Sequence, residues 1–121
     1  MSLEKKIEKK VCDYAKKNGF LALKINVVGE RGWPDRLFID PDGWCVWIEF
    51  KAPGKKPDPI QQHRMEDLMN RGIPVFVIDN EEIGLAVIKE LVAARVPKES
   101  DEALTIAGEC GIILGPGTRE D

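Results

Sequence analysis

"DRLFIDPDGWCVWIEFK", residues 35–51, contains two strand-like runs joined by the turn sequence Pro-Asp-Gly, which predicts a β-hairpin. Successive residues of a strand alternate between its two faces. Both faces of the second run, residues 44–51, carry aromatic or branched side chains, so both are predicted to be buried. One of those faces nevertheless ends in Glu49 and Lys51, and charged groups on a buried strand require partners or a function.

The register of this hairpin brings two carboxylates together. If residues 41–43 form the loop, counting outward places Asp35 opposite Glu49. Directly opposed residues have Cβ atoms about 4.5–5.5 Å apart, so the two carboxylates would repel each other. A bound Mg²⁺ or Mn²⁺ is the simplest reason for such a pair, because these cations take oxygen ligands. A bulge at Gly43 would shift the register by one residue and weaken this argument.

The first predicted helix, residues 3–18, turns a carboxylate inward. On a helical wheel Glu4 falls in the middle of the apolar stripe and Glu8 falls on its edge. The alternative is that Glu4 lies in a frayed first turn and is stabilised there by the helix dipole. The opposite side of the wheel is basic and carries Lys5, Lys6, Lys9, Lys10, Lys16 and Lys17.

The second predicted helix, residues 59–71, follows an N-cap at Asp58 and begins with Pro59. Gln61 lies on the apolar side of this helix. The spacing Asp58-x-x-Gln61 is typical of a capping box, in which Gln61 reaches back to the backbone of Asp58. A role of Gln61 in an active site is an equally good interpretation, and the two roles are compatible.

Lys51 has two interpretations. It is either an ordinary ion-pair partner of Glu49, or a group that holds an attacking water and stabilises charge growing on phosphorus beside a metal. The preceding Pro34-Asp35, the hairpin of suitable length and the inward-facing Glu4 favour the second interpretation.

The remaining segments complete an α/β pattern. Helices are predicted at 3–18, 59–71 and 81–94, and strands at 20–28, 35–40, 44–51 and 73–79. A weak helix near 100–109 follows. The order α-β-β-β-α-β-α predicts a mixed sheet flanked by helices. The 121 residues suffice for one domain with a hydrophobic core, which we expect to span residues 1–94 with residues 95–121 as an extension.

These motifs resemble the PD-(D/E)xK nuclease superfamily, whose two-part signature matches Pro34-Asp35 and Glu49-Phe50-Lys51. The resemblance is closer to the VRR-NUC (virus-type replication-repair nuclease) family. The matching stretches are Glu4 in the first helix, "RGWPDR", "EFKAPGKK" and "PDPIQQ". They cover roughly residues 3–80.

The resemblance implies a restriction-endonuclease-like αβββαβ core and a Mg²⁺- or Mn²⁺-dependent endonuclease that hydrolyses phosphodiester bonds. It assigns Asp35, Glu49 and the backbone carbonyl of Phe50 as metal ligands and Lys51 as the catalytic lysine. Glu4 is the helical carboxylate, with Glu8 in reserve, and Gln61 is an accessory polar group. Small stand-alone members of the family act on branched DNA, including four-way (Holliday) junctions, as homodimers. Many are phage-encoded, which suggests a role in replication or repair.

Charge does not exclude a DNA partner. The net charge is −3, but residues 1–60 hold 12 Lys/Arg against 9 Asp/Glu, whereas residues 61–121 hold 6 against 12. Four cations flank the motifs and are candidates for contacts with DNA phosphates, unless they are solvated loop charges: Arg31, Arg36, Lys55 and Lys56.

Composition excludes several other classes of protein. No apolar run approaches the roughly 20 residues of a membrane helix. Three scattered cysteines favour a reducing, cytoplasmic setting over a disulfide or zinc framework. No nucleotide-binding glycine motif is present. Two alternatives to a nuclease remain open, a branched-DNA-binding module that does not cut and a small α/β interaction domain.

Overall fold

The computed structural model describes residues 1–94 and confirms the predicted order of elements. The elements are α1 (Leu3–Lys17), β1 (Leu21–Lys24), β2 (Arg36–Ile39), β3 (Cys45–Phe50), α2 (Pro59–Asn70), β4 (Val75–Ile78) and α3 (Glu81–Ala94). The strand predicted at 20–28 is shorter than expected and ends at Lys24, with one further ladder hydrogen bond from Ile25. The helix predicted near 100–109 lies outside the described residues.

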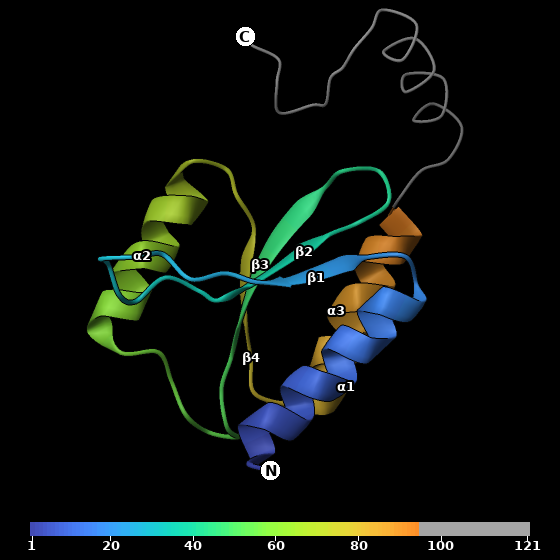
Figure 1. Ribbon diagram of the computed structural model, residues 1–121, viewed down its shortest axis with the longest axis horizontal. Helices are drawn as coiled ribbons and strands as arrows, with labels where there is room; N and C mark the ends of the chain where they lie inside the picture. Colours follow the sequence, from blue (N-terminus) through green and yellow to red (C-terminus); the bar gives the residue numbers. More distant parts are fainter. Residues whose placement is uncertain (95–121) are drawn as a thin grey trace, which may run out of the picture.

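The four strands form one mixed sheet in the order β1-β2-β3-β4. The pairs β1–β2 and β2–β3 are antiparallel, whereas β3 and β4 are parallel and are connected through α2. Helices α1 and α3 lie side by side on one face of the sheet, and α2 lies on the other (Figure 1). This is the α/β, restriction-endonuclease-like arrangement that the sequence predicts.

The hairpin has the predicted register. Arg36 pairs with Ile48, so the next pair outward is Asp35 and Glu49. Gly43 adopts φ 92° and donates its backbone N–H to Asp40 within the loop, at 2.9 Å. The positive φ explains the glycine at this position, because other residues rarely adopt it. The β2–β3 hairpin therefore places both carboxylates at the end away from its turn.

The hydrophobic core lies between the sheet and the helices α1 and α3. Val46, Ile48 and Phe50 of β3 point into it. The two helices approach each other closely at Gly84, where a Cβ atom would meet Val11 Cγ2 at 2.5 Å and Ile78 Cγ2 at 3.0 Å. A glycine inside α3 is therefore a packing requirement, although glycine costs about 1 kcal/mol of helix propensity relative to alanine.

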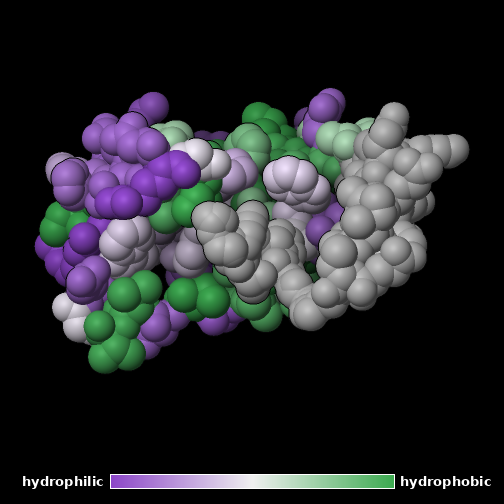
Figure 2. Space-filling view, turned by 90° about the horizontal axis from the view of Figure 1, so that it is seen from above, coloured by the Kyte–Doolittle hydropathy of each residue, from purple (hydrophilic) through white to green (hydrophobic). Residues whose placement is uncertain are grey.

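The opposite face of the sheet is covered only in part, so the prediction that both faces are buried is wrong there. Trp47 is half-buried and Cys45 is exposed. Helix α2 covers the end of this face near Glu49 and itself buries only Met65. The α2 side of the molecule shows a largely hydrophilic surface with small apolar patches (Figure 2).

The first two helices begin where the capping residues predict. The Ser2 hydroxyl accepts a hydrogen bond from the Lys5 backbone N–H at 3.1 Å, and Asp58 caps α2 ahead of Pro59. Helix α1 ends at Lys17 with Asn18 as its C-cap, where the Asn18-Gly19 pair predicts a stop. Among the described helices, none is long and apolar enough to cross a membrane.

Candidate active site

Three polar side chains from two elements meet where β3 ends. The Lys51 ammonium lies 3.5 Å from Glu49 Oε2, and the Gln61 amide donates to the same oxygen at 3.2 Å. Glu49 and Lys51 are mostly buried, with side-chain exposures of 11% and 18%. The sequence predicts this meeting of Glu49, Lys51 and Gln61, and the roles assigned to them stay predictions.

Gln61 joins the cap of α2 to this cluster. Its Oε1 accepts from the backbone N–H of Asp58 at 3.0 Å, and its own backbone N–H donates to the Asp58 carboxylate at 2.9 Å. Its Nε2 remains available and donates to Glu49. The capping box is therefore confirmed and holds one end of the amide while the other end contacts Glu49; an active-site role of Gln61 stays a prediction.

Glu49 lies in a concentration of negative charge. Burial is the main cause that raises the pKa of its carboxyl group. The nearby charges of Asp35 and Glu4 raise the pKa further, whereas Lys51 lowers it. The charges of Asp35, next to β2, and of Glu4, in α1, therefore both act on Glu49 at the end of β3.

Asp35 is fixed by its backbone and paired through its side chain. Its carbonyl accepts from the Ile25 N–H at 2.8 Å, which extends the β1–β2 ladder by one residue. Its half-exposed carboxylate forms an ion pair with the ammonium group of Lys24 at 3.1 Å. Among residues 1–94, no three His, Cys, Asp or Glu side chains lie close enough together to hold a metal ion in this arrangement. Asp35 and Glu49 are each turned toward a lysine.

The two glutamates of α1 have different surroundings. Glu4 lies half-buried in the first turn, near enough to Glu49 to influence its pKa. Glu8 is the more deeply buried of the two, contrary to the order on the helical wheel. Its Oε2 accepts from Arg36 Nε at 2.6 Å and from Lys24 Nζ at 3.3 Å. Since cations of β1 and β2 already occupy Glu8, Glu4 is the better-placed helical carboxylate.

Arg36, a candidate DNA contact, points inward in this structure. Its guanidinium group binds the buried Glu8 and also donates to the Ala22 carbonyl at 3.2 Å. The ion pair helps to lower the pKa of Glu8, against the opposing effect of burial. Arg36 is placed as a structural partner of α1, and its contact with DNA stays a prediction.

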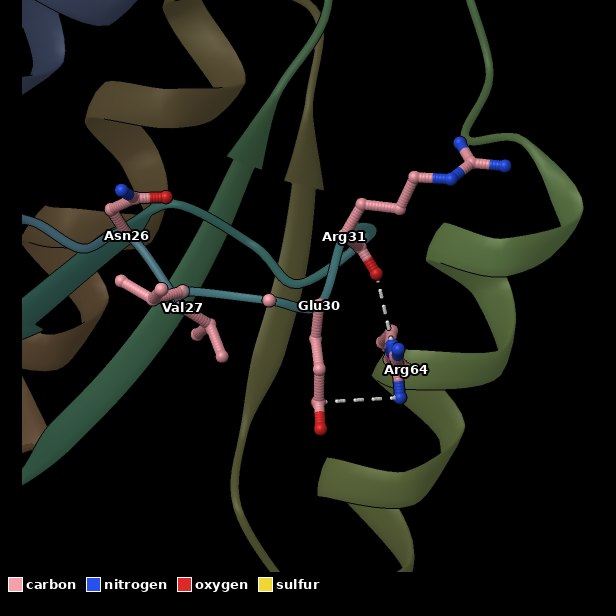
Figure 3. A pocket seen from close by; sticks show the side chains of 7 residues that line it. Asn26, Val27, Glu30, Arg31 and Arg64 are labelled. Carbon is pink, nitrogen blue, oxygen red and sulfur yellow. Dashed lines mark hydrogen bonds and ion pairs between the residues drawn. The ribbon is translucent and has the colours of Figure 1, made fainter.

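The loop before Asp35, residues 25–34, contacts α2 through Arg64. Arg64 lies over the Trp33 ring, 4.7 Å from its centre, and donates to the Arg31 carbonyl at 3.1 Å. Glu30 accepts from Trp33 Nε1 at 2.9 Å and pairs with Arg64 (Figure 3). Gly32 makes this contact possible, because it has φ 93° and a Cβ there would overlap Ile60. The glycine of "RGWPDR" is thereby explained.

Arg31 lies on the outside of the same loop. It lines an open depression of about 690 Å³ together with Asn26, Val27, Val28, Gly29, Glu30 and Arg64. Its guanidinium group points away from the Glu30–Arg64 pair (Figure 3). Lys55 and Lys56 are exposed in the loop between β3 and α2. That loop is fastened by Asp79, whose carboxylate accepts from the Gly54 backbone N–H at 3.0 Å.

Three residues in and around this site are not indicated by the sequence motifs. Lys24, Arg64 and Asp79 contact respectively Asp35, the loop before Asp35 and the loop after Lys51. The position of Asp79 directly after the strand "IPVFVI" is the only signal that could have indicated one of them. The contacts of Lys24 and Arg64 depend on how the loop between β1 and β2 folds. This loop contains a turn at Gly29, where the Glu30 N–H donates to the Val27 carbonyl, but that turn does not by itself place either side chain.

Oxygen donors of this type suit a divalent cation. A cation between Asp35 and Glu49 would relieve the repulsion that contributes to the raised pKa of Glu49. Carboxylates and backbone carbonyls are the ligands that Mg²⁺ and Mn²⁺ prefer. Asp35, Glu49 and the Phe50 carbonyl therefore suit such an ion, provided that the Asp35 side chain breaks its ion pair with Lys24.

The fold is a mixed sheet in which Glu49 lies at the end of a strand, Lys51 follows it and Asp35 lies opposite. These features place the protein in the class of PD-(D/E)xK-type nuclease cores. No family model matches the chain. The chain is 39% identical over 80 residues to "Putative nuclease p44" of Acyrthosiphon pisum secondary endosymbiont phage 1, which covers 66% of this chain and 86% of that protein. A solved structure described as a "VRR_NUC domain" superposes with a TM-score of 0.66 and 28% identity, over 79% of this chain and all of that one. The chain belongs to the VRR-NUC family of nucleases.

Proposed function

We propose that this VRR-NUC chain is a Mg²⁺- or Mn²⁺-dependent DNA endonuclease that hydrolyses phosphodiester bonds at the end of β3. The observation that carries the proposal is the contact of Glu49 with both Lys51 and Gln61, in a place where the charges of Asp35 and Glu4 converge electrostatically. A purely structural strand end would gain nothing from that accumulation of negative charge.

The residues divide the chemistry among them. Asp35, Glu49 and the Phe50 carbonyl would hold the metal, which when bound supplies charge neutralisation at the phosphate and a more acidic water. Lys51 would hold the attacking water and stabilise the negative charge that grows on the phosphate oxygens. Burial of the lysine strengthens this effect, because charges interact more strongly where water is excluded.

The other two polar groups position the first three. Gln61 fixes the orientation of the Glu49 carboxylate through its amide, which the capping box holds in place. Glu4 would accept a hydrogen bond from the attacking water, since it is the α1 carboxylate near Glu49 that has no cation assigned to it in the described residues. Arg31, Lys55 and Lys56 would contact DNA phosphates from the two loops that flank the site.

We further propose that the substrate is branched DNA, including four-way junctions, cut by a homodimer in replication or repair. The family resemblance supports this choice. The end of β3 lies between two loops, one held by the Arg64–Arg31 hydrogen bond and the other by the Asp79–Gly54 hydrogen bond. This arrangement is compatible with an extended nucleic-acid partner. The name of the phage relative, a nuclease, supports the reaction class and says nothing of the DNA structure.

A cleavage panel tests the proposal. End-labelled four-way junction, flap, linear duplex and single-stranded DNA of matched length are incubated with Mg²⁺, Mn²⁺ or a chelator, using wild type and Asp35→Ala. We expect metal-dependent cleavage that is fastest on the junction and is lost in the variant. Binding of the junction without cleavage under either metal would identify a non-cutting module instead. Equal rates on all duplex substrates would remove the branched-DNA part alone.

A further inference from the structure

Lys24 is placed between a predicted metal ligand and a buried glutamate. Its ammonium nitrogen lies 3.1 Å from Asp35 Oδ2 and 3.3 Å from Glu8 Oε2. Lys24 is the last residue of β1 and lies opposite Arg36 of β2 in the strand register, so its side chain reaches both carboxylates from there. Neither carboxylate is adjacent to Lys24 in sequence, so this bridge is a product of the tertiary fold.

The two carboxylates differ in the number of cationic partners that they have besides Lys24. Glu8 has further cationic partners, Arg36 at 2.6 Å and Lys5 at 3.6 Å from its Oε1. For Asp35, Lys24 is the only cation within ion-pair distance among the described residues. The lysine therefore neutralises Asp35, while Glu8 provides a permanent second acceptor that keeps the ammonium group close to it.

We infer that Lys24 is a positioning residue of the metal site: it occupies Asp35 until a divalent cation replaces it, and it then retains Glu8 as its partner. The inference rests on the proposed metal-dependent function. It explains why Asp35, a predicted metal ligand, is paired with a lysine in this structure.

A competing internal cation has a measurable consequence. A divalent ion that binds Asp35 must displace the ammonium group, so the lysine weakens metal binding by roughly the strength of a half-exposed ion pair. Such pairs correspond to about a two- to five-fold change in affinity. Glu8 limits the loss, since the displaced ammonium group keeps one partner and is not left without a counter-charge.

The test is calorimetric titration of metal-stripped protein with Mn²⁺ in the absence of DNA. Lys24→Met retains the length of the side chain and removes the charge, and it should bind Mn²⁺ about two- to five-fold more tightly than wild type. Lys24→Arg keeps an ion-pair partner for Asp35 and should bind as wild type does. The matched control is Lys5→Met, which removes the same charge from the other oxygen of Glu8 and does not touch Asp35, so its affinity should rise less.

Melting temperatures of the same proteins, measured with and without Mn²⁺, provide a second test. Without metal, Lys24→Met should melt below wild type, because Asp35 loses its counter-charge. Saturating Mn²⁺ should then raise its melting temperature by more than that of wild type, in line with the tighter binding. If methionine prevents folding, Lys24→Gln provides the same comparison with a polar side chain.

The outcomes separate this inference from the proposed function. Wild-type protein that binds no Mn²⁺ overturns both. Binding by wild type with unchanged or weaker binding by Lys24→Met overturns the inference alone, and so does an equal gain in Lys5→Met, which would indicate a general charge effect. Loss of binding in Glu49→Gln together with a gain confined to Lys24→Met supports both.

Discussion

Replacing Arg36 by methionine distinguishes a structural role of this residue from a contact with DNA. The Arg36 guanidinium group binds the buried Glu8 at 2.6 Å, and the side-chain exposures are 20% and 7%. Removing one partner of a buried pair costs about 3–5 kcal/mol. Lys24 and Lys5 remain near Glu8, so we expect a loss of about 2–3 kcal/mol in the free energy of unfolding. In a domain of this size that corresponds to a fall in melting temperature of about 10–20 °C.

The pH dependence of that loss follows from Glu8. Its pKa is lower in the folded protein than the ordinary value of 4.5, because of its cationic partners. A carboxyl group with a lowered pKa stabilises the fold above the ordinary value, and this contribution disappears as the pH falls through the folded-state pKa. The difference between wild type and Arg36→Met should therefore be largest at neutral pH and shrink in acid.

Urea denaturation followed by circular dichroism measures these free energies. The double variant Glu8→Leu/Arg36→Met should recover most of the loss, because it removes both charges from the buried site. A structural role of Arg36 is excluded if the stability of Arg36→Met lies within about 0.5 kcal/mol of wild type, the range of ordinary surface substitutions. If junction binding falls in that case, Arg36 is the DNA contact that the sequence predicts.

Three further substitutions test individual parts of the site. Gly32→Ala should lose about 1–3 kcal/mol more stability than Gly29→Ala in urea denaturation, because both positions have positive φ but only a Cβ at Gly32 overlaps Ile60; equal losses would contradict this. Glu49→Gln should melt above wild type at neutral pH, since its raised folded pKa makes the ionised group destabilising, and the gain should vanish below the ordinary value of 4.5; a lower melting temperature would contradict it. Gln61→Ala should cost about 0.5–2 kcal/mol, because the Asp58 backbone N–H and Glu49 each lose a hydrogen-bond partner, and melting equal to wild type would argue against both contacts.

The hairpin shows what a short range of sequence can determine. The loop Pro-Asp-Gly fixes the number of residues in the turn, and the register follows from that count, so the pairing of Asp35 with Glu49 is predictable from the sequence alone. The capping box of α2 is equally predictable, since it depends on Asp58 and Gln61 within one turn of a helix. Both are local features whose geometry is set by neighbouring residues.

The surroundings of the two helical glutamates could not be predicted in the same way. A helical wheel gives the direction of a side chain about the helix axis, but it does not give the point along the helix at which the sheet lies. Glu8 is the buried residue because Lys24 and Arg36 reach it from two other strands. Their positions depend on the loop at residues 25–35, which contains a local turn closed by the Glu30 N–H and the Val27 carbonyl and is held against α2 by contacts of Arg64.

The incomplete cover of the second sheet face has a similar origin. Alternating apolar residues predict burial on both sides of β3, but the length and placement of α2 decide how much of that face is covered. Cys45 is exposed as a result, whereas Glu49 at the other end of the strand is buried beneath Gln61. A strand pattern indicates which faces are apolar and does not indicate what packs on them.

Lys51, at the end of β3, is the residue that we propose acts on the scissile phosphate. The measurement that tests it most directly is the single-turnover rate of cleavage of a labelled four-way junction in Mn²⁺ by wild type, Lys51→Met and Lys55→Met, with DNA affinity measured for each. Loss of a catalytic group of this kind costs about 100-fold or more in rate. We predict such a loss for Lys51→Met at unchanged DNA affinity. Lys55→Met removes the same charge from an exposed position in the neighbouring loop, so at saturating protein its rate should stay within about three-fold of wild type, and the loss of its proposed phosphate contact should appear in DNA affinity instead. Equal cleavage rates for wild type and Lys51→Met would contradict the account.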